Sequence, residues 1–283
     1  MKQCMISLAK SIYLNTPYKS LRNICFRVFC AMVRNRIVQS SIDGINYKLD
    51  LGEVIDLGIY LNRYESDMTA AIEKICRPGF TVLDIGANIG AHALRLSSIV
   101  GESGRVYAFE ATDYAYQKLV HNISLNQFKN IIPIQIVLSD KNLLRQSIHF
   151  RSSWPTKGNP IEQESIVDFT KLDDLCKREK IEHVDLIKLD VDGNEYSVIM
   201  GAESLLKNQY PCILMEVWGL NFSDDLKNPF IVLKQFGYRF FNINTGEEYV
   251  SVEDLRSIVS LDGELLDFAF NIVAKKQIIF KNS

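Results

Sequence analysis

Apolar and polar residues follow regular periods along most of the chain. Short apolar runs typical of buried strands alternate with amphipathic stretches typical of helices. The predicted order is strand 80–85, helix 89–100, strand 105–110, helix 113–126, strand 131–138, helix 171–179, strand 184–190, helix 194–207, strand 211–217, helix 225–235, strand 238–243 and a strand near 268–275. Such alternation indicates parallel strands joined by crossover helices. We therefore predict an α/β fold with a mostly parallel sheet of seven core strands and helices on both faces.

One stretch, residues 146–170, interrupts this alternation. Its ends, 146–150 and 165–169, are β-like, and the polar part between them contains Trp154. We predict that it is an insertion over the rim of the functional site. No internal repeat or low-complexity linker divides the chain, so residues 80–283 are assigned to a single core domain.

An extension precedes the first core strand. Residues 38–42 and 45–51 are β-prone and flank Asp43-Gly44, a pair that tolerates positive φ, so they predict a hairpin. Residues 67–76 then show helical spacing. We expect residues 41–79 to flank the core.

Residues 1–40 are assigned to a separate basic segment that contains an amphipathic helix. From Ser20 to Val38, apolar residues recur at helical spacing among arginines. Arg27 and Arg34 interrupt the apolar run before the ~20 residues that a bilayer span requires. The favoured interpretation is that this helix packs on the core domain or on a second subunit.

A second hypothesis is that residues 20–38 lie on an anionic membrane surface. The arginines would then face lipid headgroups, and Phe26 or Phe29 would face acyl chains. The sequence leaves the oligomeric state open, with a dimer as one option.

Composition and charge are those of an ordinary globular protein. The 283 residues are 47% hydrophobic and 23% charged, a balance that supports a sizeable core. The net charge of −2 gives no reason to expect nucleic-acid binding. The charge is uneven, because residues 1–40 hold seven basic residues and no acid, whereas the remainder holds 25 basic and 34 acidic residues.

The six cysteines form no C-x-x-C pair and are scattered along the chain, so we predict reduced thiols. The four histidines also lack metal-ligand spacing relative to the cysteines, and no zinc site is predicted. We expect a cytoplasmic protein, with peripheral contact at the inner membrane surface as the alternative.

A loop rich in glycine follows the first core strand. Gly86 and Gly90 lie at a strand-to-helix turn, where glycine lets a ligand approach the backbone. Asn88 stands where a dinucleotide-binding loop has its second glycine, which disfavours a pyrophosphate. Glu110 ends the next strand, where an acid accepts hydrogen bonds from ribose hydroxyls. These residues favour a cofactor that has a ribose and no pyrophosphate.

Four motifs in order resemble the FkbM family of methyltransferases. They are Asp84-Ile-Gly-Ala-Asn-Ile-Gly90, Tyr107-Ala-Phe-Glu110, Leu138-Ser139-Asp140 and Asp185-Leu-Ile-Lys-Leu-Asp-Val-Asp-Gly-Asn-Glu195. The resemblance implies S-adenosylmethionine as cofactor and a Rossmann-like sheet of seven strands whose last strand is antiparallel. It also implies O-methylation of a hydroxyl on a sugar, a glycolipid or another small natural product.

The resemblance further assigns a set of cofactor-binding positions. Asp84 would hold the loop and reach toward the amino end of the cofactor, while backbone N–H groups at the helix start would suit a carboxylate. Ser139 and Asp140 would read the adenine. The predicted cofactor-binding residues are Glu65, Asp84, Gly86, Ala87, Asn88, Gly90, His92, Glu110, Ser139, Asp140 and Asp190.

Acids at the ends of later strands are the candidate catalytic residues. We predict that Asp190 faces the sulfonium and the acceptor, and that Glu195 orients or deprotonates the acceptor hydroxyl. Glu216 ends the next parallel strand and should neighbour Asp190. Where the family usually has a glutamate, this chain has Asp192.

Two alternatives remain open. Asp190 and Glu216 together allow a hard-cation site of the kind that some catechol-type methyltransferases use. The sequence offers no clear third ligand, so no metal is predicted. The other alternative is an NAD-dependent oxidoreductase on an ordinary dinucleotide fold, against which Asn88 and the acids from Asp190 to Glu195 argue.

Overall fold

The computed structural model of the chain describes residues 10–11, 19–34, 36–156, 161–261, 264–265 and 269–276, and all structural statements below concern these residues. The parts of the predicted basic segment at residues 1–9, 12–18 and 35 lie outside them.

The main sheet has eight strands in the order β12-β11-β15-β10-β9-β3-β4-β5. Their bounds are β3 Thr81–Ile85, β4 Arg105–Glu110, β5 Ile131–Gln135, β9 Leu186–Leu189, β10 Cys212–Trp218, β11 Tyr238–Asn242, β12 Glu248–Tyr249 and β15 Ala269–Lys276. Strands β5, β4, β3, β9 and β10 are mutually parallel. The last strand, β15, is antiparallel to both β10 and β11, between which it lies. The predicted class and the antiparallel last strand are thus confirmed, and β12 adds a short eighth strand at one edge.

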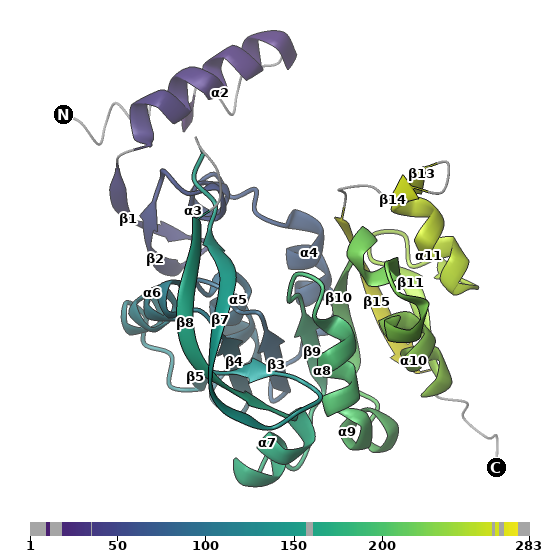
Figure 1. Cartoon of the computed structure of the whole chain (residues 1–283). Coiled ribbons are helices and arrows are strands. Elements are labelled where there is room, and N and C mark those ends of the chain that lie inside the picture. Colours follow the sequence, from purple (N-terminus) through teal and green to yellow (C-terminus); the bar gives the residue numbers. More distant parts are fainter. Residues whose placement is uncertain are drawn as a thin grey trace.

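Helices cover both faces of this sheet (Figure 1). They are α4 Ser66–Ile75, α5 Ala91–Val100 and α6 Asp113–Ser124, and then α7 Leu172–Arg178, α8 Glu195–Gly201, α9 Glu203–Asn208, α10 Pro229–Gln235 and α11 Val252–Ile258. Val82 of β3 packs in the core with α4, α5 and α6, whereas its neighbour Leu83 packs in the core with α7 to α11. Successive strand residues point to opposite faces, so strands that are buried on both sides are mostly apolar. Asp84 of β3 and Lys188 of β9 are buried charged exceptions.

Several predicted elements differ in detail from the observed ones. The predicted helix 194–207 is divided at Ala202 into α8 and α9. The predicted helix 225–235 is a 3₁₀ turn, η2 Asp225–Lys227, followed by α10, which Asn228 caps by accepting from two backbone N–H groups. The short helices α3 Val54–Tyr60 and α11, the 3₁₀ turn η1 Gly219–Phe222 and the hairpin β13 Ser260–Leu261 with β14 Glu264–Leu265 were not predicted.

The predicted insertion is a long β-hairpin. Its strands, β7 Leu143–Ser153 and β8 Ile161–Thr170, are antiparallel. Residues 137–138, expected to continue the third core strand, instead form β6 Val137–Leu138 and pair with β8. The third core strand therefore ends at Gln135, because the backbone beyond it is committed to the hairpin sheet.

The N-terminal extension consists of a helix and a hairpin. Strands β1 Ile37–Ile42 and β2 Ile45–Asp50 are antiparallel around Asp43-Gly44, as predicted. They form a sheet of their own, but Tyr47 and Leu49 of β2 are buried in the core shared with α4 and α5. The hairpin thus flanks the main sheet and contributes to its core.

The basic helix, α2 Lys19–Val33, lies beyond this hairpin at one end of the molecule (Figure 1). Phe29 and Val33 are buried, and the Phe29 ring stacks on Tyr60 of α3 at 6.5 Å between centroids. The hypothesis that Phe29 faces acyl chains is therefore wrong, because this ring is used in packing. No helix in the described part of the chain combines the length and apolarity needed to cross a bilayer.

Candidate functional site

A cavity of about 710 Å³ lies where β3, β4, β9 and β10 end at their carboxyl edges. Its wall includes Gly86 after β3, Glu110 at the end of β4, Asp190 after β9 and Glu216 in β10. The strand order reverses at β3, because β4 lies on one side of it and β9 on the other. Ligands of open α/β sheets bind in the crevice at such a switch point, and the volume suits a small molecule.

The glycine loop passes close to the strand beside it. Gly86 has φ +81°, and a Cβ placed there would lie 1.8 Å from the carbonyl oxygen of Asp190. Gly90 has φ +93° and begins α5. Only glycine fits at Gly86, both for its left-handed backbone and for the contact with Asp190.

The backbone N–H groups of this loop are used inside the protein. Those of Gly86 and Ala87 donate to the carbonyl of Phe109, and that of Gly90 donates to the carbonyl of Ala87. The Asn88 N–H donates to the Glu110 carboxylate at 3.0 Å, and the Ile89 N–H donates to the Asn88 side chain. The expectation that these N–H groups would bind a cofactor carboxylate is therefore wrong for residues 86–90.

Glu110 is held in place by hydrogen bonds at both carboxylate oxygens. Oε2 accepts from Asn88, and Oε1 accepts from the N–H and the hydroxyl of Thr112 at 2.9 and 2.7 Å. Burial raises the pKa of Glu110, and the hydrogen bonds from Thr112 and Asn88 oppose this rise. The carboxylate lines the cavity, and its remaining lone pairs can accept further hydrogen bonds.

Left-handed backbone conformations occur in the wall of this cavity. Three lining residues that are not glycine, Glu65, Asn88 and Asp192, have φ of 37°, 49° and 51°. Left-handed backbone at such residues costs about 1–2 kcal/mol each. Strain of this kind is typical of ligand-binding sites, where the surrounding structure holds residues in uncommon conformations.

A buried cation organises the acids beneath the loop. The Lys188 ammonium donates to the Gly86 carbonyl at 3.0 Å and to Asp190 at 3.1 Å. It also lies 3.7 Å from Asp84 Oδ1. Although burial opposes its charge, Asp190 and Asp84 raise the pKa of Lys188. Lys188 therefore stays charged and fixes the backbone around Gly86.

Asp84 and Glu65 lie in different surroundings within this network. Asp84 is fully buried, and neither of its carboxylate oxygens has a hydrogen-bond partner among the described residues. Burial raises the pKa of Asp84, against the attraction of Lys188. Glu65 accepts from His92 Nε2 at 2.8 Å. Burial alone would raise the pKa of Glu65, but His92 and Lys188 lower it overall.

Three acids meet on the other side of the cavity. Asp190, Asp192 and Glu216 each present a carboxylate oxygen, and these oxygens lie within 4.8 Å of one another. Burial, together with the neighbouring Asp190, raises the pKa of Glu216. Asp192 is the third acid that sequence spacing alone did not identify, and the cluster has the composition of a hard-cation site.

The sequence matches the model of the methyltransferase FkbM domain over residues 84–240, which is more than half of the chain. The chain belongs to the FkbM methyltransferase family. The antiparallel last strand, β15, is the one that the family resemblance implied.

Comparison with curated proteins found no match. Among solved structures, the chain is similar to the methyltransferase FkbM from Methylobacillus flagellatus, with a TM-score of 0.44 and 15% identity over 89% of this chain and 60% of the other. It is also similar to Aeropyrum pernix fibrillarin crystallised with S-adenosyl-L-methionine (TM-score 0.43, 14% identity, 84% and 82% coverage). A third similar structure is a SAM-dependent methyltransferase from Aquifex aeolicus, with a TM-score of 0.41 and 15% identity over 74% of this chain and 89% of the other. The family assignment rests on the family model, not on these distant similarities.

The cavity of this FkbM methyltransferase gathers some of the predicted residues and leaves others out. Those that line it are Glu65, Gly86, Asn88, Glu110, Asp190 and Glu216. Asp84, Ala87, Gly90 and His92 are buried and do not line it. Ser139 and Asp140 do not line the cavity, whose wall there is formed by Ile136, Val137 and Leu138. Ser139 is buried in the protein: its N–H donates to the carbonyl of Thr170, its carbonyl packs against Gly201, and its hydroxyl donates to Asp140 at 3.1 Å.

The structure also corrects the role predicted for Glu195. This side chain is 2% exposed and does not line the cavity. Oε1 accepts from the N–H groups of Val191 and Gly193 at 3.2 and 3.3 Å, and Oε2 accepts from the Asn221 amide at 2.6 Å. Glu195 therefore positions the loop that carries Asp192, and it does not reach an acceptor hydroxyl.

Apolar residues form the outer part of the cavity. Trp154 comes from the β7–β8 hairpin, Val54 from α3, and Trp218 and Leu220 from the end of β10 and η1. The sequence placed Trp154 in the predicted rim insertion but did not identify Val54, because no motif marks the residues that a distant insertion brings together.

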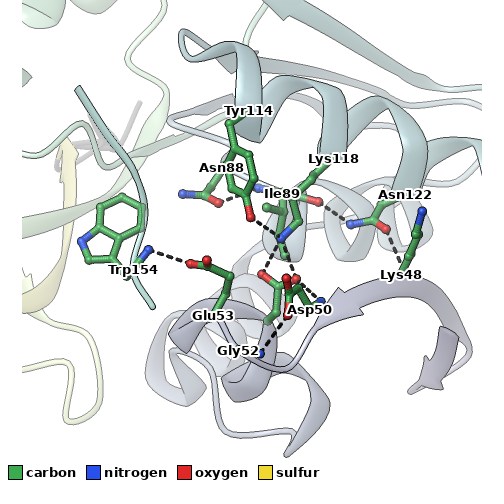
Figure 2. Close-up of polar contacts among 11 residues, drawn as sticks. Lys48, Asp50, Gly52, Glu53, Asn88, Ile89, Tyr114, Lys118, Asn122 and Trp154 are labelled. Atoms are coloured by element: carbon green, nitrogen blue, oxygen red, sulfur yellow. Dashed lines mark hydrogen bonds and ion pairs between the residues drawn. The ribbon is translucent and has the colours of Figure 1, made fainter. Parts of the chain in front are cut away.

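The segment that follows β7, residues 154–156, is hydrogen-bonded to the start of α3 and the residues before it. The Val54 N–H donates to the Trp154 carbonyl at 2.8 Å, and the Thr156 N–H donates to the Gly52 carbonyl at 2.7 Å. The Glu53 carboxylate accepts from the Trp154 N–H at 2.7 Å, as Figure 2 shows. Two segments about a hundred residues apart in sequence thus form one wall of the cavity.

A buried ion pair anchors this wall to α6. Lys118 donates to both oxygens of Asp56, at 2.7 and 2.8 Å, and the Asp50 N–H also donates to Asp56 (Figure 2). The pKa of Asp56 is raised by burial in spite of Lys118, and the pKa of Lys118 is raised by Asp56 in spite of burial. Burial of the Asp56 carboxylate thus offsets much of its attraction to Lys118. The ion pair therefore holds the cavity wall against α6 more than it stabilises the fold.

Proposed function

We propose that this protein is an S-adenosylmethionine-dependent O-methyltransferase that acts on a hydroxyl of a sugar, a glycolipid or another small natural product. The observation that carries the proposal is that one cavity holds a fixed acid suited to a ribose, Glu110, and a second acid with a raised pKa, Glu216. Membership of the FkbM family supports methyl transfer as the reaction.

The cofactor half of the cavity fits S-adenosylmethionine in its chemistry. Glu110 can accept hydrogen bonds from the ribose hydroxyls, while Phe109 and Leu138 offer apolar surface to the adenine. Glu65 and Asp190 place negative charge where a sulfonium and an amino group carry positive charge. The cofactor supplies an already activated methyl group, so the protein has to align the acceptor and take its proton.

Glu216 is the proposed general base. A base is most effective when its pKa lies near the working pH, and burial raises the pKa of Glu216 toward that range. Asp190, held by Lys188 at 3.1 Å, orients the acceptor hydroxyl between itself and Glu216. Alignment of the acceptor supplies much of the remaining rate enhancement.

The outer part of the cavity supports a sugar as the acceptor. Trp154 and Trp218 provide aromatic faces on which the apolar face of a sugar ring can stack, and both line the cavity. Asp190, Asp192 and Glu216 provide acceptors for several hydroxyl groups. A ring with many hydroxyls uses both features at once.

The test compares cofactors first and acceptors second. Thermal shift with S-adenosylmethionine and with NAD should show stabilisation by the former alone, since a ligand that binds the folded state raises its melting temperature. Stabilisation by NAD alone would favour the oxidoreductase. Labelled methyl donor is then supplied with glycan and lipid fractions, and Glu216→Gln should lower kcat by about 10²–10⁴-fold with unchanged cofactor affinity.

A metal-dependent O-methyltransferase is the second candidate, and the mutual approach of Asp190, Asp192 and Glu216 within 4.8 Å favours it. These residues would hold a divalent cation that binds acceptor oxygens. Activity that is lost with a chelator and restored by Mg²⁺ supports this version. Activity that survives the chelator supports Glu216 as a base without metal.

A further inference from the structure

Helix α2 exposes an apolar stripe on the side that faces away from the protein. Ile24, Val28 and Met32 recur every four residues and are 59%, 55% and 41% exposed. Phe29 and Val33, which lie on a different side of the helix, are 1% and 0% exposed. The helix therefore has two apolar sides, and packing against the body uses only one of them.

Basic residues border this stripe. Arg27 and Arg34 are exposed, and Arg36 follows them at the start of β1. The first acidic residue of the chain is Asp43, whereas the chain beyond residue 40 has an excess of acids. The helix is thus the cationic end of an otherwise acidic protein.

We infer that α2 docks this protein on an anionic lipid bilayer surface through Ile24, Val28 and Met32, with the neighbouring arginines at the headgroups. A helix with an apolar side bordered by arginine lies in the bilayer interface, and anionic lipids attract the basic residues. This inference stands on α2 alone and does not depend on the proposed methyltransferase activity.

A second copy of the chain fits the stripe less well. A standard protein interface buries about 800 Å² on each partner. Three partly exposed side chains supply far less apolar area than that. A bilayer requires no complementary surface, and the insertion of a few side chains together with basic residues is sufficient for reversible binding.

Membrane docking would also have a consequence for the cavity. Phe29 of α2 stacks on Tyr60 at the end of α3, and Val54 at the start of α3 lines the cavity. A single short helix therefore connects the docking surface to the wall of the site. A lipid-linked acceptor would then lie at the same bilayer surface as the protein, a consequence that does rest on the proposed function.

The test is co-sedimentation of the full chain with vesicles of phosphatidylcholine, with or without phosphatidylglycerol. The wild type should pellet with the anionic vesicles only, and less at 1 M salt, where the Debye length falls to about 3 Å. The triple variant Ile24→Gln, Val28→Gln and Met32→Gln keeps helix propensity and should bind anionic vesicles at least about tenfold more weakly.

The matched control removes three exposed apolar residues from the acidic body, with Leu144→Gln, Leu226→Gln and Val250→Gln. It should pellet as the wild type does. Equal pelleting of both triple variants and the wild type, or no pelleting of the wild type, would overturn the inference. So would a wild-type dimer in light scattering that becomes a monomer in the α2 variant without any lipid binding. Circular dichroism of each variant shows that loss of binding is not loss of fold.

Discussion

The variant Glu195→Gln distinguishes a positioning role of this residue from a catalytic one. Its carboxylate accepts three hydrogen bonds, from the N–H groups of Val191 and Gly193 and from the amide of Asn221. In Glu195→Gln only one terminal oxygen remains, and the new NH₂ group faces at least one of these donors. Asn221 cannot turn its amide without loss of the bond that its own oxygen accepts from Trp218 at 2.8 Å.

The expected loss of stability follows from these contacts. Hydrogen bonds to a charged group contribute about 1.5–3 kcal/mol each, and an unsatisfied buried donor costs about 1–3 kcal/mol. The two backbone bonds are long, at 3.2 and 3.3 Å, so values near the lower limits apply. We therefore expect Glu195→Gln to lower the free energy of unfolding by about 2–4 kcal/mol.

The assay is urea unfolding at pH 7 beside steady-state kinetics with the methyl acceptor. Glu203→Gln is the control, because Glu203 lies in the next helix, is exposed and forms an ion pair with Lys207 across one helical turn, a contact worth about 0.2–0.5 kcal/mol. A positioning role predicts reduced stability with a modest effect on kcat. Unchanged stability with a 10²–10⁴-fold lower kcat would refute this reasoning and restore Glu195 as the base.

Three further predictions concern the loop, the base and the anchored wall. Gly86→Ala places a Cβ 1.8 Å from the Asp190 carbonyl oxygen and should weaken the binding of S-adenosylmethionine, measured by calorimetry, by at least about tenfold. Gly44→Ala is the control. Gly44 has φ +80° and no neighbour within 4 Å among the described residues, so this variant has the same backbone strain of about 1–2 kcal/mol without the clash. Equal binding by the two variants would contradict the steric argument. Because burial raises the pKa of Glu216, the folded state keeps a proton that the unfolded state releases, so the stability of the wild type falls as pH rises above the ordinary glutamate pKa of 4.5. Glu216→Gln removes this fall. The free energy of unfolding of the variant relative to the wild type, measured with urea, should therefore increase from pH 5 to pH 8 by about 1.4 kcal/mol for each unit of pKa shift crossed. A difference that does not vary with pH would show that Glu216 has an ordinary pKa. Lys118→Met leaves the Asp56 carboxylate buried without Lys118 and should lower the free energy of unfolding by about 3–5 kcal/mol. The double variant Lys118→Met, Asp56→Asn should recover most of this loss. No recovery would mean that the packing of Lys118, not its charge, determines the loss of stability.

Much of the main fold could be predicted from the sequence, because its signals are local. The apolar runs of the parallel strands are buried on both faces, and the turn at Asp43-Gly44 needs only two residues that tolerate positive φ. Gly86 and Glu110 could be identified for the same reason, since each lies at the end of a strand whose length the pattern defines. The antiparallel position of β15 was available only from the family resemblance, because strand order depends on contacts between distant segments.

The tertiary structure decided which role each of the acidic residues has. Glu195 and Asp192 are three residues apart in sequence. The local sequence does not show that Glu195 is buried and positions the loop, whereas Asp192 is exposed and lines the cavity. The backbone bonds from Val191 and Gly193 turn Glu195 inward, while the left-handed φ of Asp192 turns this residue toward Glu216.

The same distinction applies to the cavity wall and to α2. The sequence by itself determined the cofactor loop, the strand-end acids and a basic amphipathic helix, since periodicity and turn chemistry act over a few residues. Only the tertiary structure decided that Trp154 meets Glu53, that Ser139 faces the protein interior, and that Phe29 is packed while Val28 is exposed. The physical reason is that burial depends on which segments meet in space, and these segments are separated by up to a hundred residues in the chain.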